Sequence, residues 1–209
     1  MQITEFFDEM AYGELSDLSL AEGEEIKATA KPKLIIALND ALLELYTKYV
    51  LRLVDVPLVL VPTSKTYAVE PENSVRIVYA APVLQRDYDD LYHKPNYFNI
   101  RGNQLIFTDF PTITQFGLTY QWKPSKLKVN PATPNFERQV IEADPTIMPL
   151  VRTLVAAAIF NNMGSEAHKA IGIGLLNKAQ FMKAEMESSG ILNTNVMFEN
   201  RRFQANGFV

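Results

Sequence analysis

The spacing of apolar residues along this chain changes twice, and that change constrains the fold more than any other feature. Between Leu34 and Leu53 apolar residues recur at steps of three and four, the period of one helix face: Leu34, Leu38, Leu42, Leu45, Tyr49 and Leu53. From Val54 to Pro57 this period gives way to short runs rich in Val, Ile, Tyr and Phe. Helical spacing returns after Pro131. The sequence therefore predicts helices at both ends and strands between them.

Four short runs in the middle of the chain are predicted to be strands, because Pro, Asn, Gly and Asp turn residues separate them. They are Val56–Val61, Val75–Ala80, Gln104–Phe110 and Gln115–Trp122. In the last run large apolar residues alternate with polar or small ones, which predicts a strand buried on one face: Phe116, Leu118, Tyr120 and Trp122. Arg101-Gly102-Asn103 lies between two apolar runs and predicts a hairpin turn.

Further helices are predicted on both sides of these strands. Ile3 to about Leu20 is amphipathic with a break near Gly13, and helical character returns around Phe136–Ala143. A longer helix is expected through Val151 to Ile159, with Gly164 as its C-cap, and another from Ser165-Glu166. The apolar residues of that last helix are expected to face the core: Ile171, Leu175, Phe181 and Met182.

These elements predict an α+β fold in which both ends of the chain build one helical bundle. We expect residues 1–54 and 131–190 to form the bundle, residues 55–130 to form an inserted antiparallel β domain, and residues 191–209 to form an extended C-terminal arm. The apolar content of 47% favours a well-packed globule over a disordered chain.

Composition excludes several classes of chemistry. The chain has no cysteine, so disulfide frameworks, thiol nucleophiles and Cys-ligated metals are ruled out. Its net charge is -4 with scattered lysines and arginines, which argues against a basic patch for tight nucleic-acid binding. The acidic start and the absence of an apolar run near the ~20 residues that span a bilayer predict no membrane partner and no standard secretion.

No coherent catalytic or metal set is recognisable. His93 and His168 lie in different segments without ligands at metal-binding spacing, and the acidic run Asp87-Tyr88-Asp89-Asp90 lacks the pattern of a calcium loop. Gly172-Ile173-Gly174 lacks the context of a phosphate-binding loop, so close helix packing is the better interpretation. We therefore expect no metal, no cofactor and no enzymatic turnover.

The segment from Ile191 to Val209 is expected to bind a partner. It has no helical or strand period, yet it is rich in phenylalanine, unlike a tail that needs only to be soluble. Aromatic residues and arginine are enriched at interfaces. The candidate contact residues are Phe198, Arg201, Arg202, Phe203, Phe208 and Val209.

Several motifs together resemble the head-to-tail adaptor (connector) proteins of tailed bacteriophages. They are Tyr12-Gly13-Glu14-Leu15-Ser16-Asp17-Leu18 with the long helix after it, the hairpin from Tyr97 to Phe107, the strand Leu118-Thr119-Tyr120-Gln121, the helix from Met148 to Gly164, and Phe203 to Val209. The resemblance covers most of the chain.

The resemblance implies a structural virion protein, assembled in the host cytoplasm and located in the neck. Such proteins form a ring, usually of twelve copies, that docks under the portal protein and meets a tail or nozzle protein. Double-stranded DNA passes through the ring without tight binding, and the C-terminal arm grips the portal. Two alternatives stay open: another neck or tail ring component, such as a tail-completion or baseplate subunit, and an uncatalogued hydrolase.

Overall fold

The fold was analysed in a computed structural model. It describes residues 1–16, 21–22, 25–68, 73–82, 98–111, 115–130, 132–133 and 135–194. The chain divides into two compact units: a helical unit made of Met1–Tyr49 and Pro124–Asn193, and a β unit made of Val50–Lys123. The predicted α+β class is confirmed, since helices come from both ends of the chain and antiparallel strands from its middle.

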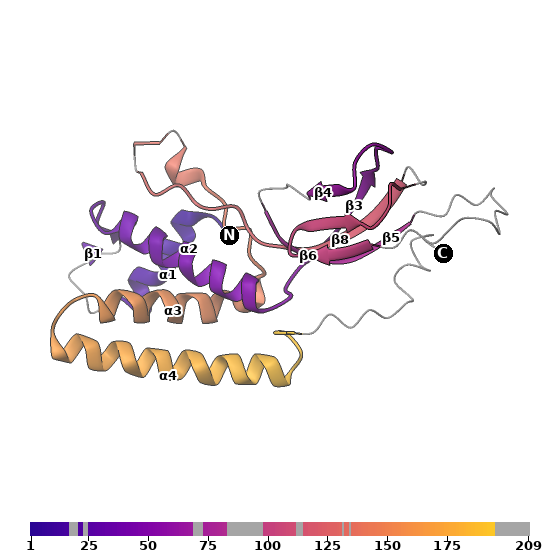
Figure 1. Ribbon diagram of the computed structural model, residues 1–209. Helices are drawn as coiled ribbons and strands as arrows, with labels where there is room; N and C mark the ends of the chain where they lie inside the picture. Colours follow the sequence, from indigo (N-terminus) through magenta and orange to yellow (C-terminus); the bar gives the residue numbers. More distant parts are fainter. Residues whose placement is uncertain are drawn as a thin grey trace. The chain divides into compact units, whose positions relative to one another are not determined.

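The helical unit is built on α1 (Ile3–Tyr12), α2 (Lys31–Lys48), α3 (Met148–Asn161) and α4 (Glu166–Ser188). The helix α3 lies between α2 and α4 (Figure 1). A short pair of strands, β1 (Ala21–Glu22) and β2 (Glu25–Ile26), joins α1 to α2. The side chains of α1, α2 and α3 form the core, which includes Ile3, Phe6, Met10, Leu34, Ile35, Leu38, Leu45, Leu150, Val151 and Val155.

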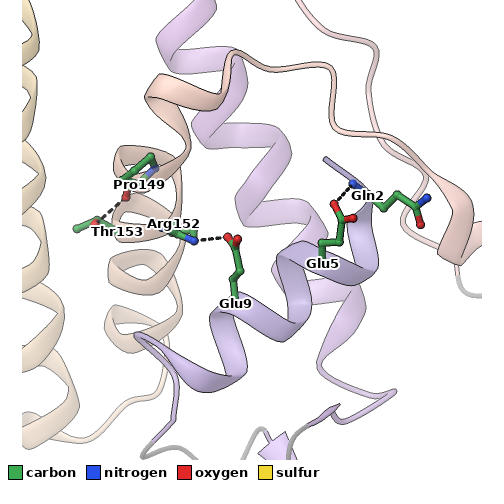
Figure 2. Close-up of polar contacts among 6 residues, drawn as sticks. All are labelled: Gln2, Glu5, Glu9, Pro149, Arg152 and Thr153. Carbon is green, nitrogen blue, oxygen red and sulfur yellow. Dashed lines mark hydrogen bonds and ion pairs between the residues drawn. The ribbon is translucent and has the colours of Figure 1, made fainter.

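Polar contacts fix the ends and faces of these helices (Figure 2). At the start of α1 the Gln2 N–H donates to the Glu5 carboxylate at 2.8 Å, which satisfies a backbone donor that has no partner inside the helix. Farther along α1, Glu9 forms an ion pair with Arg152 of α3. The Thr153 hydroxyl donates to the Pro149 carbonyl at 3.0 Å, so this buried polar group is satisfied within α3.

The helix predicted from the apolar spacing between Leu34 and Leu53 is present as α2, but it ends earlier than expected. It stops at Lys48, Tyr49 is extended, and Leu53 begins the strand β3 (Leu53–Val59). Tyr49 is fully buried, and its hydroxyl donates to the Glu187 carboxylate of α4, so this tertiary contact holds it outside the helical conformation. The apolar period beyond Tyr49 is thus not a continuation of the helix.

Two further helix predictions need correction. Phe136–Ala143 is not a helix beyond the short 3₁₀ turn η1 (Phe136–Arg138), because Val140 forms a β-bridge with Gln2. Gly164 is not the cap of α3, which Asn162 provides. Gly164 instead has a left-handed φ of 78° in the connection to α4, a conformation that glycine adopts without strain. Ser165 then caps α4, as its hydroxyl oxygen accepts from the His168 N–H at 3.2 Å.

The core face of α4 was predicted wrongly in part. Ile171 is 47% exposed and Phe181 is 80% exposed, whereas Leu175 and Met182 are half-buried. The fully buried positions of α4 are Gly172 and Ala179. Small residues face the core because α3 lies too close for large ones: a β-carbon on Gly172 would come within 2.3 Å of the Asn161 Oδ1. Close packing is thus confirmed for Gly172, while Gly174 faces open space.

The β unit contains two three-stranded antiparallel sheets in the described residues. The first has the order β3–β8–β5, with β5 (Ser74–Pro82) and β8 (Gln115–Trp122). The second has the order β4–β7–β6, with β4 (Thr66–Ala68), β6 (Phe98–Arg101) and β7 (Gln104–Phe107). The predicted hairpin turn is confirmed, since Arg101 pairs with Gln104 and Gly102 has a φ of 56°.

Aromatic side chains join the two sheets. Phe116 of β8 makes edge-to-face contacts with Phe98 and Phe107, with ring centroids 5.2 and 5.5 Å apart. Tyr67 of β4 packs on Phe107 in the same way at 5.8 Å. These geometries are the ones that aromatic pairs prefer, so the cluster is the core of the β unit.

The strand β8 has the predicted bounds but is buried on both faces at its second half. The predicted core residues Phe116, Leu118, Tyr120 and Trp122 are buried, and so are Thr119 and Gln121 on the opposite face. The Thr119 hydroxyl donates to Asp55 at 2.6 Å, and the Arg76 Nε donates to the Gln121 side-chain oxygen at 2.9 Å. Neighbouring strands thus satisfy these polar groups and cover them.

The chain returns to the helical unit at Pro124, before the expected boundary at Asn130. Leu127 is buried, and its backbone N–H and carbonyl both bond the Asn39 side chain of α2, at 2.9 and 3.0 Å. The Lys128 N–H donates to the Gln139 side chain at 2.6 Å. These contacts make the stretch after Pro124 part of the helical unit.

Candidate functional site

The partner-binding residues predicted from the sequence lie outside the described residues. They are Phe198, Arg201, Arg202, Phe203, Phe208 and Val209. His93 and the acidic run at 87–90 also lie outside them. The candidate site that follows is built from residues of the described units.

The start of the predicted arm belongs to the helical unit. The N–H groups of Ile191 and Leu192 both donate to the Met186 carbonyl, at 2.9 and 3.0 Å, and Leu192 is buried. Gly190, with a φ of 76°, makes the turn that brings these residues back onto α4. The boundary expected at Ile191 is thus wrong by a few residues, because Leu192 packs in the core of its own unit.

A groove on the helical unit is the most prominent candidate for binding. It has a volume of about 860 Å³ and lies between α2, the C-terminal half of α3 and the middle of α4. This volume is within the range of about 300 to 1,000 Å³ that ligand sites usually have. Apolar side chains provide most of its lining, among them Leu34, Ala37, Ala41, Leu154, Ala158 and Leu176.

Charged residues of α2 border this groove. Lys33 lies toward the N-terminal end of α2, Asp40 lies at its middle, and Glu44 lies about one turn farther along the same helix. Glu44 pairs with Lys183 of α4 at 2.5 Å, whereas Lys33 and Asp40 make no ion pair within the described part of the chain. Among the described residues the groove thus offers a cation and a carboxylate, seven positions apart, that form no ion pair.

Apolar side chains remain exposed at the groove. Ile36 is 49% exposed and Leu176 is 37% exposed, and both belong to its lining. An apolar surface rimmed by charge is typical of sites that bind another chain or a ligand. Sequence reasoning missed the groove, although Ile36 lies outside the predicted apolar stripe of α2 and was a signal for a second contact face.

Contacts between helices hold the groove walls in place. Lys183 is 16% exposed, so its pair with Glu44 ties α4 to α2 more firmly than a fully solvated ion pair. At the C-terminal end of α2, burial raises the pKa of Tyr49, and the hydrogen bond to Glu187 raises it further. Tyr49 therefore stays a neutral donor to Glu187 near neutral pH.

In the described ranges no three His, Asp or Glu side chains gather as a metal ion would require. None of the described helices is long and apolar enough to cross a membrane. His168, the histidine of α4, lies 6.0 Å from the Phe160 ring between centroids.

The fold and the groove together define a two-unit α+β protein with an apolar, charge-bordered groove on its helical unit. Models of known protein families do not match this chain, and a search of curated proteins found no match either.

Proposed function

We propose that this chain is a head-to-tail adaptor subunit of a tailed bacteriophage. Copies of it form a ring that docks under the portal protein and extends the DNA channel toward the tail. The observation that carries this proposal is the arrangement of the chain: helices from both ends build one unit, the β unit is inserted between them, and a segment rich in Phe and Arg follows α4. The resemblance in sequence implies the same layout.

The charge of the chain agrees with such a role. A DNA conduit should not hold phosphates tightly while the genome passes, and a net charge of -4 gives no general attraction to them. The function is then assembly, without turnover of a substrate.

The free energy that holds the subunits in the assembly has to come from many repeated contacts. Ordering a segment costs about 1 to 2 kcal/mol per residue, and a buried aromatic side chain returns about 1.5 to 3 kcal/mol. A few phenylalanines on one subunit therefore cannot hold it firmly on a portal or on its neighbour. Many identical contacts around a ring supply the remainder, because each bound subunit raises the effective concentration of the next contact.

Native mass spectrometry of the full chain with the portal protein of its phage tests the proposal. We expect a complex that contains one portal ring and several copies of this chain. Truncation after Thr194 keeps Leu192 and should leave the melting temperature unchanged, but it should abolish the ring on the portal. Asn206→Ala is a matched control within the removed segment and should still assemble. If the full chain does not bind the portal protein but binds a tail protein, the chain is another neck or tail component, and the proposal is refuted.

A further inference from the structure

We propose that neighbouring copies of this chain meet through two exposed helix faces, one on α2 of the first copy and one on α4 of the next, in antiparallel orientation. The α2 face consists of Lys33, Ile36, Asp40 and Leu43. The α4 face consists of Gly174, Lys178, Phe181 and Glu185. The inference rests on the proposed function, because this contact is the one that would join the subunits of the ring.

The α4 face has a large apolar side chain and a bare stretch of backbone. Phe181 is 80% exposed, the highest value among the large apolar side chains in the described ranges. Gly174 lies two turns before it, and a β-carbon there would meet no described atom within 4 Å. Its φ is not left-handed, so neither conformation nor packing in its own unit requires glycine, which weakens a helix interior. Close approach of another molecule explains both features.

The α2 face is also apolar and exposed. Ile36 is 49% exposed and Leu43, seven positions farther along α2, is 51% exposed. Lys33 and Asp40 alternate with them, are exposed, and make no ion pair within the described part of the chain. Exposed apolar residues bordered by charge are typical of a surface that binds another chain.

The charges of the two faces agree in spacing and in sign. Lys33 and Asp40 are seven positions apart on α2, and Lys178 and Glu185 are seven positions apart on α4. Both separations are about 10 Å along the helix axis. In the antiparallel orientation Lys33 lies opposite Glu185 while Asp40 lies opposite Lys178, so two pairs of opposite charge form together. A parallel orientation forms at most one of these pairs.

The apolar residues match in the same register to within one helical position, about 1.5 Å. Phe181 of one copy then lies against Ile36 and Ala37 of the next, at the border of the groove. Leu43 lies over the bare backbone at Gly174. The exposed apolar residues of each face thus gain a partner from the other face.

The arrangement of rows on each helix selects the antiparallel orientation as well. At about 100° per residue, the two charged residues of each face form one row, and the other two residues form an adjacent row on the same side of it. When two such faces meet antiparallel, the charged rows meet each other and so do the apolar rows. In a parallel contact the charged row of one helix would meet the apolar row of the other.

The partner has to be a second copy, because the two faces of one chain cannot meet. On the opposite side of α4, Gly172 and Ala179 are buried and Lys183 pairs with Glu44 of the same chain's α2. The α4 face therefore points away from its own α2. Since the two faces differ, the contact is head-to-tail, and a series of such contacts closes into a ring when the rotation between copies allows it.

Disulfide trapping tests the inference, since the chain has no natural cysteine to interfere. Full-length Leu43→Cys is mixed with differently tagged full-length Gly174→Cys and oxidised, alone and with the portal protein. The control mixture replaces Gly174→Cys by Ser188→Cys, which is exposed on α4 and lies about 21 Å farther along the axis. We expect heterodimers in about tenfold excess over this control. No excess in either condition overturns the inference.

A chain with both cysteines tests the head-to-tail geometry. Oxidation of the double variant Leu43→Cys/Gly174→Cys should give covalent species larger than a dimer, because each copy offers one face to each of two neighbours. A product that stops at the dimer, or a monomer closed on itself, would contradict the proposed contact.

Charge reversal gives an independent measurement. Asp40→Lys in the Leu43→Cys chain should reduce trapping about fivefold, and Lys178→Asp in the Gly174→Cys chain should restore it. Both residues are exposed, so these variants should melt like the parent chain. Asp8→Lys, at an exposed carboxylate of α1, changes the net charge equally and should leave trapping unchanged. An equal reduction by Asp8→Lys, or no restoration by Lys178→Asp, would contradict the pairing of Asp40 with Lys178.

Portal binding separates this inference from the proposed function. A ring on the portal without trapping refutes the contact between the α2 face and the α4 face and leaves the adaptor role standing. Trapping between chains that do not bind a portal supports the contact and contradicts the adaptor role.

Discussion

At the scale of single residues, Gly172 has no room for a side chain. Asn161 at the end of α3 fills the space where a β-carbon would lie, with its Oδ1 at 2.3 Å and its backbone nitrogen at 3.1 Å. The side chain of Asn161 can turn away, but its backbone can move only with α3. Gly174, one position beyond Ile173 on the same helix, has no atom within 4 Å of the corresponding site.

This difference predicts opposite effects of the same substitution at the two glycines. Gly174→Ala should raise the free energy of unfolding by about 0.5 to 1 kcal/mol, because alanine loses less backbone entropy in a helix. Gly172→Ala should lower it by about 1 kcal/mol, because overpacking against Asn161 outweighs that gain. Urea denaturation of both variants measures the two changes in the free energy of unfolding. Equal stabilisation by both would show that α3 and α4 are not closely packed at Gly172.

At the scale of elements, α3 depends on a cap that the sequence places just before it. Asp144 precedes the 3₁₀ turn η2 (Pro145–Ile147), which continues directly into α3. Its carboxylate accepts from the Thr146 N–H at 2.9 Å and from the Thr146 hydroxyl at 2.8 Å. These two hydrogen bonds lower the pKa of Asp144 below its ordinary value.

The lowered pKa predicts a pH-dependent contribution to stability. The ionised carboxylate stabilises the fold above the unfolded pKa of about 3.9, and this stabilisation is lost as pH falls through the lower folded pKa. Asp144→Ala should therefore reduce the free energy of unfolding by about 0.5 to 1 kcal/mol at neutral pH. The reduction should shrink toward pH ~3.

Urea unfolding of the parent chain and of Asp144→Ala, at neutral pH and at pH ~3, measures this effect. Glu185→Ala is the control, because Glu185 is an exposed carboxylate of α4 whose side chain has no hydrogen bond in the described part of the chain. Its effect should be similar at both pH values. A constant effect of Asp144→Ala across this range would mean that the cap does not require the charged carboxylate.

At the scale of the whole molecule, the position of the unit boundaries can be tested. Replacing residues 50–123 by a short Gly-Ser linker should leave a helical protein that melts cooperatively, because Tyr49 and Leu127 keep their contacts. Removing residues 55–130 instead deletes Leu127. That loss costs about 2 to 5 kcal/mol, and the unpaired Asn39 side chain adds about 1 to 3 kcal/mol.

Circular dichroism and thermal melting distinguish the two deletions. If the shorter deletion also loses its helical signal, the helical unit needs the β unit to fold. If the longer deletion is as stable as the shorter one, the stretch from Pro124 to Asn130 contributes nothing to the helical unit.

The sequence by itself determined the elements whose signals are local. The alternation in Gln115–Trp122, the turn at Gly102 and the helix start at Ser165 depend on neighbouring residues, so the sequence alone predicted them. The phenylalanine- and arginine-rich segment was also visible in the sequence, but its residues lie outside the described ranges, so its contacts stay a prediction.

Only the tertiary structure decided which surfaces are buried and where the groove lies. On α4 the apolar period favoured Ile171 and Phe181, yet the close approach of α3 buries Gly172 and Ala179 instead. The hydrophobic effect favours burial of large apolar side chains, because they remove the most apolar surface from water. Where two helices pack closely, only small side chains fit between them, so size decides which residues are buried. The groove arises in the same way, since its walls come from three helices far apart in sequence, and no local pattern specifies their distance.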